Sequence, residues 1–194
     1  MGQGIRIELK AGTFLAVAVG VLILPLWFFL SFILAASFHE ICHYLALKIA
    51  GVRVYRIEVG PFGASMETEG MCPGWELICV LAGPVGSLML VPFIRWVPGI
   101  ALCGLIQGIF NLLPIYPMDG GRILRCFLEI LKIPRREKIC LIVEGITISG
   151  ILVLGFVGNR NWNLGWGGVA IGVILLLRVI RRNISCKERQ FGVQ

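Results

Sequence analysis

Residues 28–50 read FFLSFILAASFHEICHYLALKIA, an apolar stretch whose polar side chains gather near its middle, apart from a serine near its start and a lysine close to its end. A helix that crosses a hydrocarbon core about 30 Å thick needs about 20 predominantly apolar residues. This stretch is long enough, so we predict that it forms a membrane-spanning helix with polar residues at mid-depth.

Further apolar stretches lie on both sides of this one. The chain has 194 residues, of which 57% are hydrophobic and 15% are charged, and its mean hydropathy is +0.88. A soluble domain of this length needs more polar residues to cover its surface. We therefore predict an all-α polytopic membrane protein with about six transmembrane helices. The predicted spans are 13–25, 28–50, 76–94, 100–118, 139–157 and 166–180.

The formal net charge of +7 could indicate a nucleic-acid partner. With the N-terminus placed in the cytoplasm, however, every lysine and arginine except Arg95 and Arg160 falls on the cytoplasmic side of the predicted spans. That distribution is the positive-inside pattern of membrane proteins. We predict a multi-pass protein with both termini in the cytoplasm, a lipid bilayer around it and no nucleic-acid partner. Residues 1–194 then form a single membrane-embedded domain with a short basic tail over 181–194.

One segment between the second and third spans has a strand-like pattern. Val52–Glu69 reads as a small β-hairpin around Gly60-Pro61-Phe62-Gly63. An isolated hairpin is marginally stable in water. It would need support from the membrane domain, from the alternating segment Ile5–Lys10 or from a bound peptide.

The polar group in the second span is His39-Glu40-Ile41-Cys42-His43, which contains both histidines of the chain. On a helix the two imidazoles lie one turn apart on the same face, where both can reach one Zn²⁺. Glu40 between them can then act as the base that takes a proton from water. The alternative is a polar cluster that hydrogen-bonds helices together. Because an intramembrane carboxylate beside two histidines is expensive to bury, we favour a functional site.

A catalytic zinc site usually has three protein ligands and an open position. Since the chain has no third histidine, the third ligand must be a carboxylate or a thiolate. Asp119 lies in a segment broken by Pro114 and Pro117 and followed by two glycines, an irregular backbone that suits a buried or wet cavity. An ordinary Asp-Gly-Gly turn is the alternative. The other candidates are Glu144, Glu129, Glu76 and, less favoured, Cys42 or another cysteine.

Two motifs together resemble the site-2 protease family of intramembrane zinc metalloproteases. They are His-Glu-x-x-His at 39–43 and Asn-x-x-Pro-x-x-Pro-x-Asp-Gly-Gly-Arg at 111–122. Further features resemble the sporulation branch of this family, typified by stage IV sporulation protein FB. They are Pro-Phe-Gly at 61–63, Ala-Gly-Pro at 82–84 and the Asn-Leu-Leu-Pro sequence that begins at Asn111. The resemblance implies that Asp119 is the third ligand of one Zn²⁺, beside His39 and His43.

The resemblance implies a zinc metalloendopeptidase of the bacterial cell membrane that acts in regulated proteolysis. Its substrate would be a membrane-associated protein of the pro-sigma or anti-sigma factor type, a sporulation pro-sigma factor being favoured, and regulatory membrane partners are implied as well. Asn111 is our candidate for positioning substrate or stabilising the oxyanion, with a helix-to-helix hydrogen bond as the alternative. The hairpin, with Phe62 and Gly63 at its tip, could hold substrate along a strand edge. A plain connecting loop is the alternative.

The chain also departs from its apparent family. We expect neither a PDZ insert nor a C-terminal CBS domain, and Ser87 stands where many members have asparagine. We expect Ser87 to leave the ligands undisturbed. The rival class is a non-catalytic membrane zinc-binding protein, either a transporter or an inactive relative. A transporter should show paired broken helices in two repeated halves and an inactive relative should lack Glu40, so both features favour the enzyme.

Overall fold

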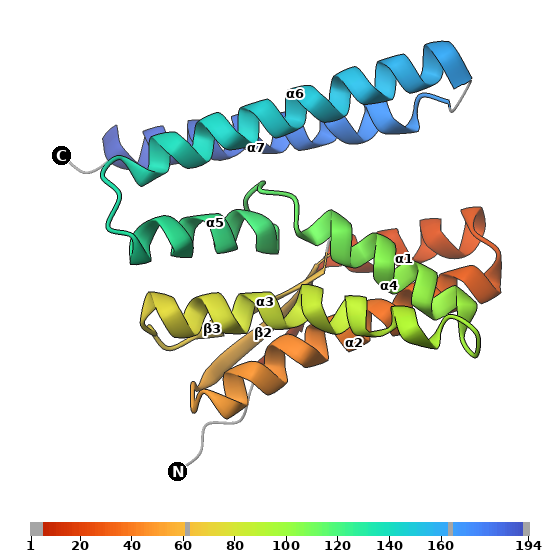
Figure 1. Cartoon of the computed structure of the whole chain (residues 1–194), viewed down its shortest axis with the longest axis horizontal. Coiled ribbons are helices and arrows are strands. Elements are labelled where there is room, and N and C mark those ends of the chain that lie inside the picture. Colours follow the sequence, from red (N-terminus) through yellow and green to blue (C-terminus); the bar gives the residue numbers. More distant parts are fainter. Residues whose placement is uncertain (1–5, 61–62, 163–164, 192–194) are drawn as a thin grey trace.

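The structure, a computed structural model, describes residues 6–60, 63–162 and 165–191, and places their side chains except those of Trp162 and of residues 181–191. Helices make up most of the chain, and three strands form a small sheet beside them (Figure 1). The strands are β1 (Arg6–Leu9), β2 (Val54–Gly60) and β3 (Gly63–Thr68). The helices are α1 (Ala11–Ile23), α2 (Leu26–Ile49), α3 (Pro73–Met89), the short 3₁₀ helix η1 (Val91–Phe93), α4 (Pro98–Asn111), α5 (Asp119–Ile130), α6 (Arg136–Trp162) and α7 (Gly167–Phe191).

Within the described residues, three helical segments are long and apolar enough to cross a membrane: Leu26–Ile49, Pro73–Phe93 and Arg136–Asn161. Three shorter apolar helices coincide with the other predicted spans: Ala11–Ile23, Pro98–Asn111 and Gly167–Ile180. Large apolar side chains point outward, as Leu22 (84% exposed) and Leu154 (73% exposed) do, which suits a protein solvated by lipid. The prediction of a helical membrane protein is confirmed, whereas the number of six crossings stays a prediction.

Two helix ends differ most from the predicted spans. The fourth span was predicted to reach residue 118, but α4 ends at Asn111. The prolines at 114 and 117 lack the N–H groups that continue a helix, so the chain turns before α5 begins at Asp119. At the other end of the chain, α7 continues through the predicted tail region to Phe191.

The sheet explains how the predicted hairpin is supported. β2 and β3 pair antiparallel, with Ile57 opposite Met66, and β1 adds a parallel strand on the far side of β2, with Leu9 opposite Val59. The N-terminal segment is therefore the support that the hairpin needs. Lys10 Nζ lies 2.5 Å from Glu58 Oε2, and this hydrogen-bonded ammonium lowers the pKa of the Glu58 carboxyl.

The helices fall into two groups. α2 packs against α3 and α4, and α3 also packs against α4 and α5. α6 and α7 form an antiparallel pair that lies beside α5 (Figure 1). A buried apolar cluster joins this pair to the loop before α5, with Ile115 of the loop against Ile148 of α6 and Leu175 of α7. The second group of helices thus contacts the chain just before Asp119.

Candidate metal centre

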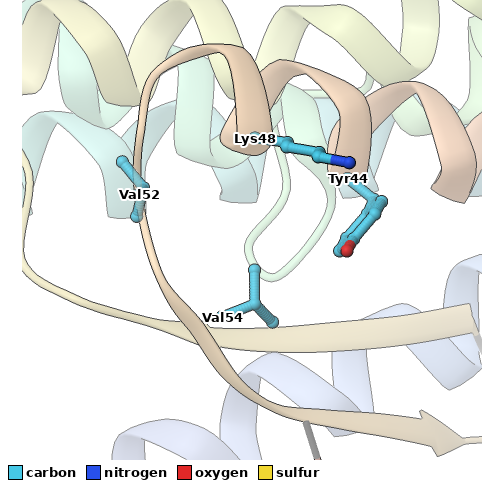
Figure 2. Close-up of a pocket in the computed structure, with 4 residues that line it drawn as sticks. All are labelled: Tyr44, Lys48, Val52 and Val54. Carbon is cyan, nitrogen blue, oxygen red and sulfur yellow. The ribbon is translucent and has the colours of Figure 1, made fainter. Parts of the chain in front are cut away.

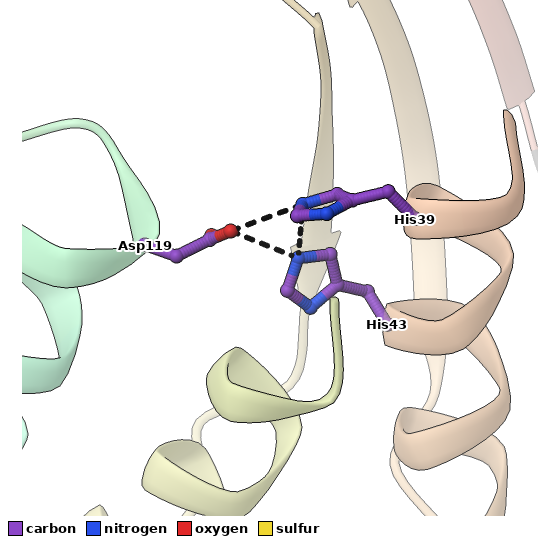
Figure 3. A group of neighbouring side chains, drawn as sticks. All are labelled: His39, His43 and Asp119. Atoms are coloured by element: carbon purple, nitrogen blue, oxygen red, sulfur yellow. Dashed lines mark hydrogen bonds and ion pairs between the residues drawn. The ribbon is translucent and has the colours of Figure 1, made fainter. Parts of the chain in front are cut away.

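Three side chains from two distant parts of the chain converge on one point (Figure 3). His39 and His43 lie one turn apart on α2, and Asp119 is the first residue of α5. His39 Nε2 and His43 Nε2 are 3.2 Å apart, and Asp119 Oδ2 lies 3.1 Å from the former and 3.3 Å from the latter. The structure therefore brings together the three predicted metal ligands.

This spacing fits a zinc ion. In a tetrahedral centre with metal–ligand bonds of about 2.0–2.1 Å, neighbouring ligand atoms lie about 3.3 Å apart. The three measured distances match that value within a few tenths of an ångström. The donor set of two imidazole nitrogens and one carboxylate oxygen is also a known catalytic zinc set. The residues present are thus suited to Zn²⁺ by both chemistry and geometry.

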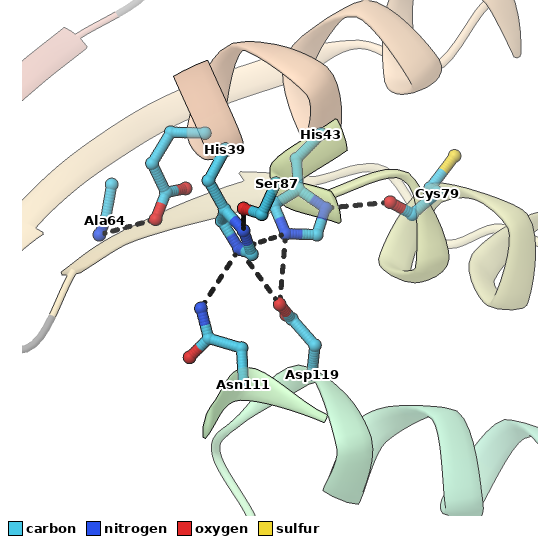
Figure 4. A network of polar contacts seen from close by, with 8 residues as sticks. His39, His43, Ala64, Cys79, Ser87, Asn111 and Asp119 are labelled. Carbon is cyan, nitrogen blue, oxygen red and sulfur yellow. Dashed lines mark hydrogen bonds and ion pairs between the residues drawn. The ribbon is translucent and has the colours of Figure 1, made fainter. Parts of the chain in front are cut away.

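The other ring nitrogens of the two histidines have partners that orient the rings (Figure 4). His43 Nδ1 donates a hydrogen bond to the backbone oxygen of Cys79 at 2.8 Å. The lone pair of His43 Nε2 then faces the other two candidate ligand atoms, His39 Nε2 and Asp119 Oδ2. His39 Nδ1 lies 2.8 Å from the hydroxyl oxygen of Ser87, a residue with no exposed surface. Such outer contacts fix the ring orientation of metal-binding histidines.

Ser87 is a residue whose role sequence reasoning missed. Its hydroxyl contacts a ligand ring directly, and the expectation that Ser87 leaves the ligands undisturbed stays a prediction. The contact arises because α3 approaches α2 very closely at Gly83. A Cβ on Gly83 would lie 2.1 Å from His43 Nε2 and 2.7 Å from His39 Nε2. Only glycine leaves room for both imidazoles at this position.

Glu40 extends from α2 toward the sheet. The backbone N–H of Ala64, in β3, donates to Glu40 Oε1 at 3.2 Å. Gly63 precedes Ala64 with φ +123°, a conformation that L side chains rarely adopt, and a Cβ there would lie 3.4 Å from Glu40 Oε1. The predicted base is therefore held between the metal ligands on its own helix and the first residues of β3.

Asn111 reaches the same centre from the last residue of α4. Its Nδ2 lies 3.2 Å from His39 Nε2 (Figure 4). An amide donor at this distance from the ligand atoms can contact a group bound at the metal position. Of the remaining predicted site residues, Gly63 lies beside Glu40, and Phe62 falls outside the described residues.

The rival carboxylates for the third ligand lie elsewhere. Glu76 pairs with Arg122 at 3.4 Å, and Glu129 pairs with Arg136 at 3.1 Å. Glu144 accepts a hydrogen bond from the backbone of Tyr116. Among the described residues, the two histidines and Asp119 form the one group of side chains placed to share a metal ion.

A separate small cavity lies where α2 ends and β2 begins (Figure 2). It has a volume of about 90 Å³ and is lined by Tyr44, Lys48, Val52 and Val54. This volume admits only a few water molecules and falls below the usual size of a ligand pocket. None of its lining residues is a candidate metal ligand.

Sequence and structure comparisons show which known proteins this chain resembles. Residues 77–154 match the sequence model of peptidase family M50. The chain is 30% identical over 158 residues to a candidate zinc metalloprotease of Synechocystis sp., and 32% identical over 148 residues to a zinc metalloprotease of Methanocaldococcus jannaschii. The matches cover 73% and 66% of this chain. Over residues 77–154 the chain is similar to peptidase family M50.

Two further facts define how far the likeness extends. The chain spans less than half the length of these relatives, since the matches cover 38% and 44% of them. The fold resembles that of a site-2 protease from Methanocaldococcus jannaschii, with a TM-score of 0.60, 24% identity and coverage of 90% of this chain and 89% of that chain. This similarity to family M50 agrees with the resemblance noted from the sequence motifs, and the sporulation branch stays a prediction.

Proposed function

We propose that this chain is an intramembrane zinc metalloprotease that hydrolyses a peptide bond in or near the membrane segment of a membrane-associated protein. The observation that carries the proposal is the convergence of His39, His43 and Asp119 within 3.1–3.3 Å of one another, with Glu40 on the same helix as the two histidines. The zinc metalloproteases among its relatives support the same activity.

The residues around the centre have complementary tasks in this proposal. His39, His43 and Asp119 hold Zn²⁺, which when bound supplies Lewis acidity and makes a water nucleophilic near neutral pH. Glu40 accepts a proton from the attacking water and returns it to the leaving amine. The Asn111 amide donates a hydrogen bond to the oxygen on which negative charge develops. The Ala64 N–H holds the Glu40 carboxylate in place at 3.2 Å.

The sheet gives this activity a way to hold an unwound substrate. Because the Ala64 N–H donates to Glu40 rather than to β2, it points to the outer edge of β3. Successive residues in a strand alternate, so the backbone groups of Met66 point to the same edge. Within the described residues no strand pairs with that edge. An extended peptide that adds to β3 would therefore run past Glu40, as in recognition by strand addition.

Replacing Met66 with proline tests this edge. Proline removes the outward N–H but leaves the bonds between β2 and β3, and proline is tolerated in edge strands. Loss of one hydrogen bond worth about 0.5–1.5 kcal/mol should lower kcat/KM about 2- to 10-fold. Met66→Ala is the matched control, because it removes the side chain and keeps the N–H. Equal rates for the two variants would contradict a substrate strand at β3 and favour a plain connecting loop.

The substrate proposal is narrower than the activity. We propose a regulated-proteolysis role in a bacterial cell membrane, with a pro-sigma or anti-sigma factor type of protein as substrate and a sporulation pro-sigma factor as the favoured case. The motif resemblance at 61–63, 82–84 and from Asn111 supports this choice.

The activity is tested with purified protein in detergent or vesicles and a panel of membrane-tethered pro-sigma and anti-sigma reporters. We expect cleavage of at least one reporter, loss of cleavage after zinc removal by 1,10-phenanthroline, and recovery when zinc is restored. A protein that binds zinc but cleaves none of the reporters would contradict the proposed substrate class and favour a non-catalytic zinc-binding protein. Cleavage that persists without metal would contradict the zinc mechanism.

A further inference from the structure

We propose that Glu144 of α6 is a positioning residue that holds the loop before α5, and thereby places Asp119, the first residue of α5, beside the two histidines. The proposal rests on the zinc centre of the proposed function. Glu144 is almost fully buried, at 2% exposure, although it lies within an apolar helix that is long enough to span the membrane. A carboxyl group is expensive to place there, so its contacts must repay that burial.

The contact that matters is with the loop between α4 and α5. The backbone N–H of Tyr116 donates to Glu144 Oε1 at 2.9 Å. The other N–H groups of residues 112–118 donate to main-chain oxygens nearby, and the two prolines have none to donate. Tyr116 is therefore the one position of this loop whose N–H donor is held by a side chain from another helix. A backbone N–H that loses its partner inside a protein destabilises the segment that carries it.

The loop is packed so closely on α5 that fixing Tyr116 also fixes Asp119. A Cβ on Gly121 would lie 2.5 Å from the backbone nitrogen of Tyr116, and one on Gly120 would lie 2.1 Å from the backbone oxygen of Leu112. The first turn of α5 is thus in direct contact with the loop backbone. Asp119 is the residue immediately before these two glycines, so a shift of the loop is a shift of the ligand.

A second attachment comes from the apolar cluster around Ile115. Its side chain is 1% exposed and packs against Ile148 of α6, one turn beyond Glu144, and against Leu175 of α7. The hydrogen bond from Tyr116 to Glu144 fixes the position of the loop along the axis of α6. The apolar contact of Ile115 holds the loop against α6 and α7. Glu144 therefore acts on the metal through Asp119 and does not touch the metal position itself.

The test measures zinc affinity by chelator competition in the full chain, without substrate. Glu144→Gln keeps an acceptor oxygen and should bind zinc within about threefold of the unmodified protein. Glu144→Leu removes the acceptor at similar volume and should lower zinc affinity about 10- to 100-fold, the range seen when an outer partner of a metal ligand is lost. Glu144→Asp withdraws the carboxylate by about 1.5 Å and should give a smaller loss in the same direction, which provides a readout if the leucine variant does not fold.

A double-mutant cycle with Asp119→Asn separates positioning from general stability. If Glu144 acts through Asp119, Glu144→Leu should change zinc affinity less than about twofold once Asp119 is replaced. An equal loss in both backgrounds, or unchanged zinc affinity in Glu144→Leu and Glu144→Asp, would overturn the proposal. Because no cleavage is measured, a protein that binds zinc and cleaves nothing would contradict the proposed function and leave this inference standing.

Discussion

Replacing Glu40 with glutamine is expected to abolish most peptide-bond cleavage while leaving zinc bound. Glutamine has nearly the same shape, and its side-chain oxygen can still accept the hydrogen bond that the Ala64 N–H donates to Glu40 Oε1. A neutral amide, however, cannot take a proton from water. Loss of general acid–base catalysis typically lowers the rate about 10²- to 10⁴-fold. The measurement is kcat/KM on a cleaved reporter, with zinc content determined by mass spectrometry on the same preparation.

The matched control is Glu76→Gln, a second carboxyl-to-amide change in an apolar helix. Glu76 lies on α3 and pairs with Arg122 at 3.4 Å, away from the three donor atoms. This partly exposed ion pair contributes little energy, so the variant should keep its rate within about threefold. Full activity in Glu40→Gln would remove the proposed base from the mechanism. A loss of zinc in Glu40→Gln would show instead that Glu40 supports the metal centre.

The local half of the candidate site could be predicted from the sequence because helical spacing decides it. Residues four apart on a helix face the same way, so His39 and His43 had to lie together once 28–50 was recognised as a helix. Spacing did not decide the third ligand, since Asp119 lies 80 residues from His39 and several other carboxylates were open. The motif resemblance selected Asp119, and the packing of α3 and α5 brings it to the histidines.

The features that the sequence did not predict are contacts between distant segments. The alternating segment at the N-terminus could be recognised as strand-like, but its parallel pairing with β2 depends on where α1 and α2 together return the chain. Ser87 and Glu144 are single polar residues within apolar helices, and nothing local shows which partner each one meets. Their position within apolar stretches nevertheless indicates that each has a hydrogen-bonding partner, because a polar group buried there needs one.

Replacing Asp119 with asparagine is expected to lower zinc affinity by more than the roughly 10- to 100-fold caused by losing an outer partner of a ligand. The substitution keeps the side-chain volume, so the first turn of α5 should still form. It replaces a charged oxygen that lies 3.1 Å and 3.3 Å from the two Nε2 atoms with a neutral amide, a weaker zinc ligand. Cleavage should be lost in parallel, because zinc no longer stays bound at the concentrations of the assay.

Glu129→Gln is the control for this effect, since it removes a carboxylate from the same helix. Glu129 pairs with Arg136 at 3.1 Å on a partly exposed surface, and nothing connects it to the histidines. The zinc affinity of the Glu129→Gln variant should therefore match that of the unmodified protein. If Asp119→Asn binds zinc as tightly as the unmodified chain, the third ligand must be another group, and the 3.1–3.3 Å cluster would then be a polar contact between α2 and α5. Loss of zinc from Asp119→Asn but not from Glu129→Gln would contradict this alternative of a mere polar contact. Only one of the two carboxylates on α5 would then contribute to zinc binding.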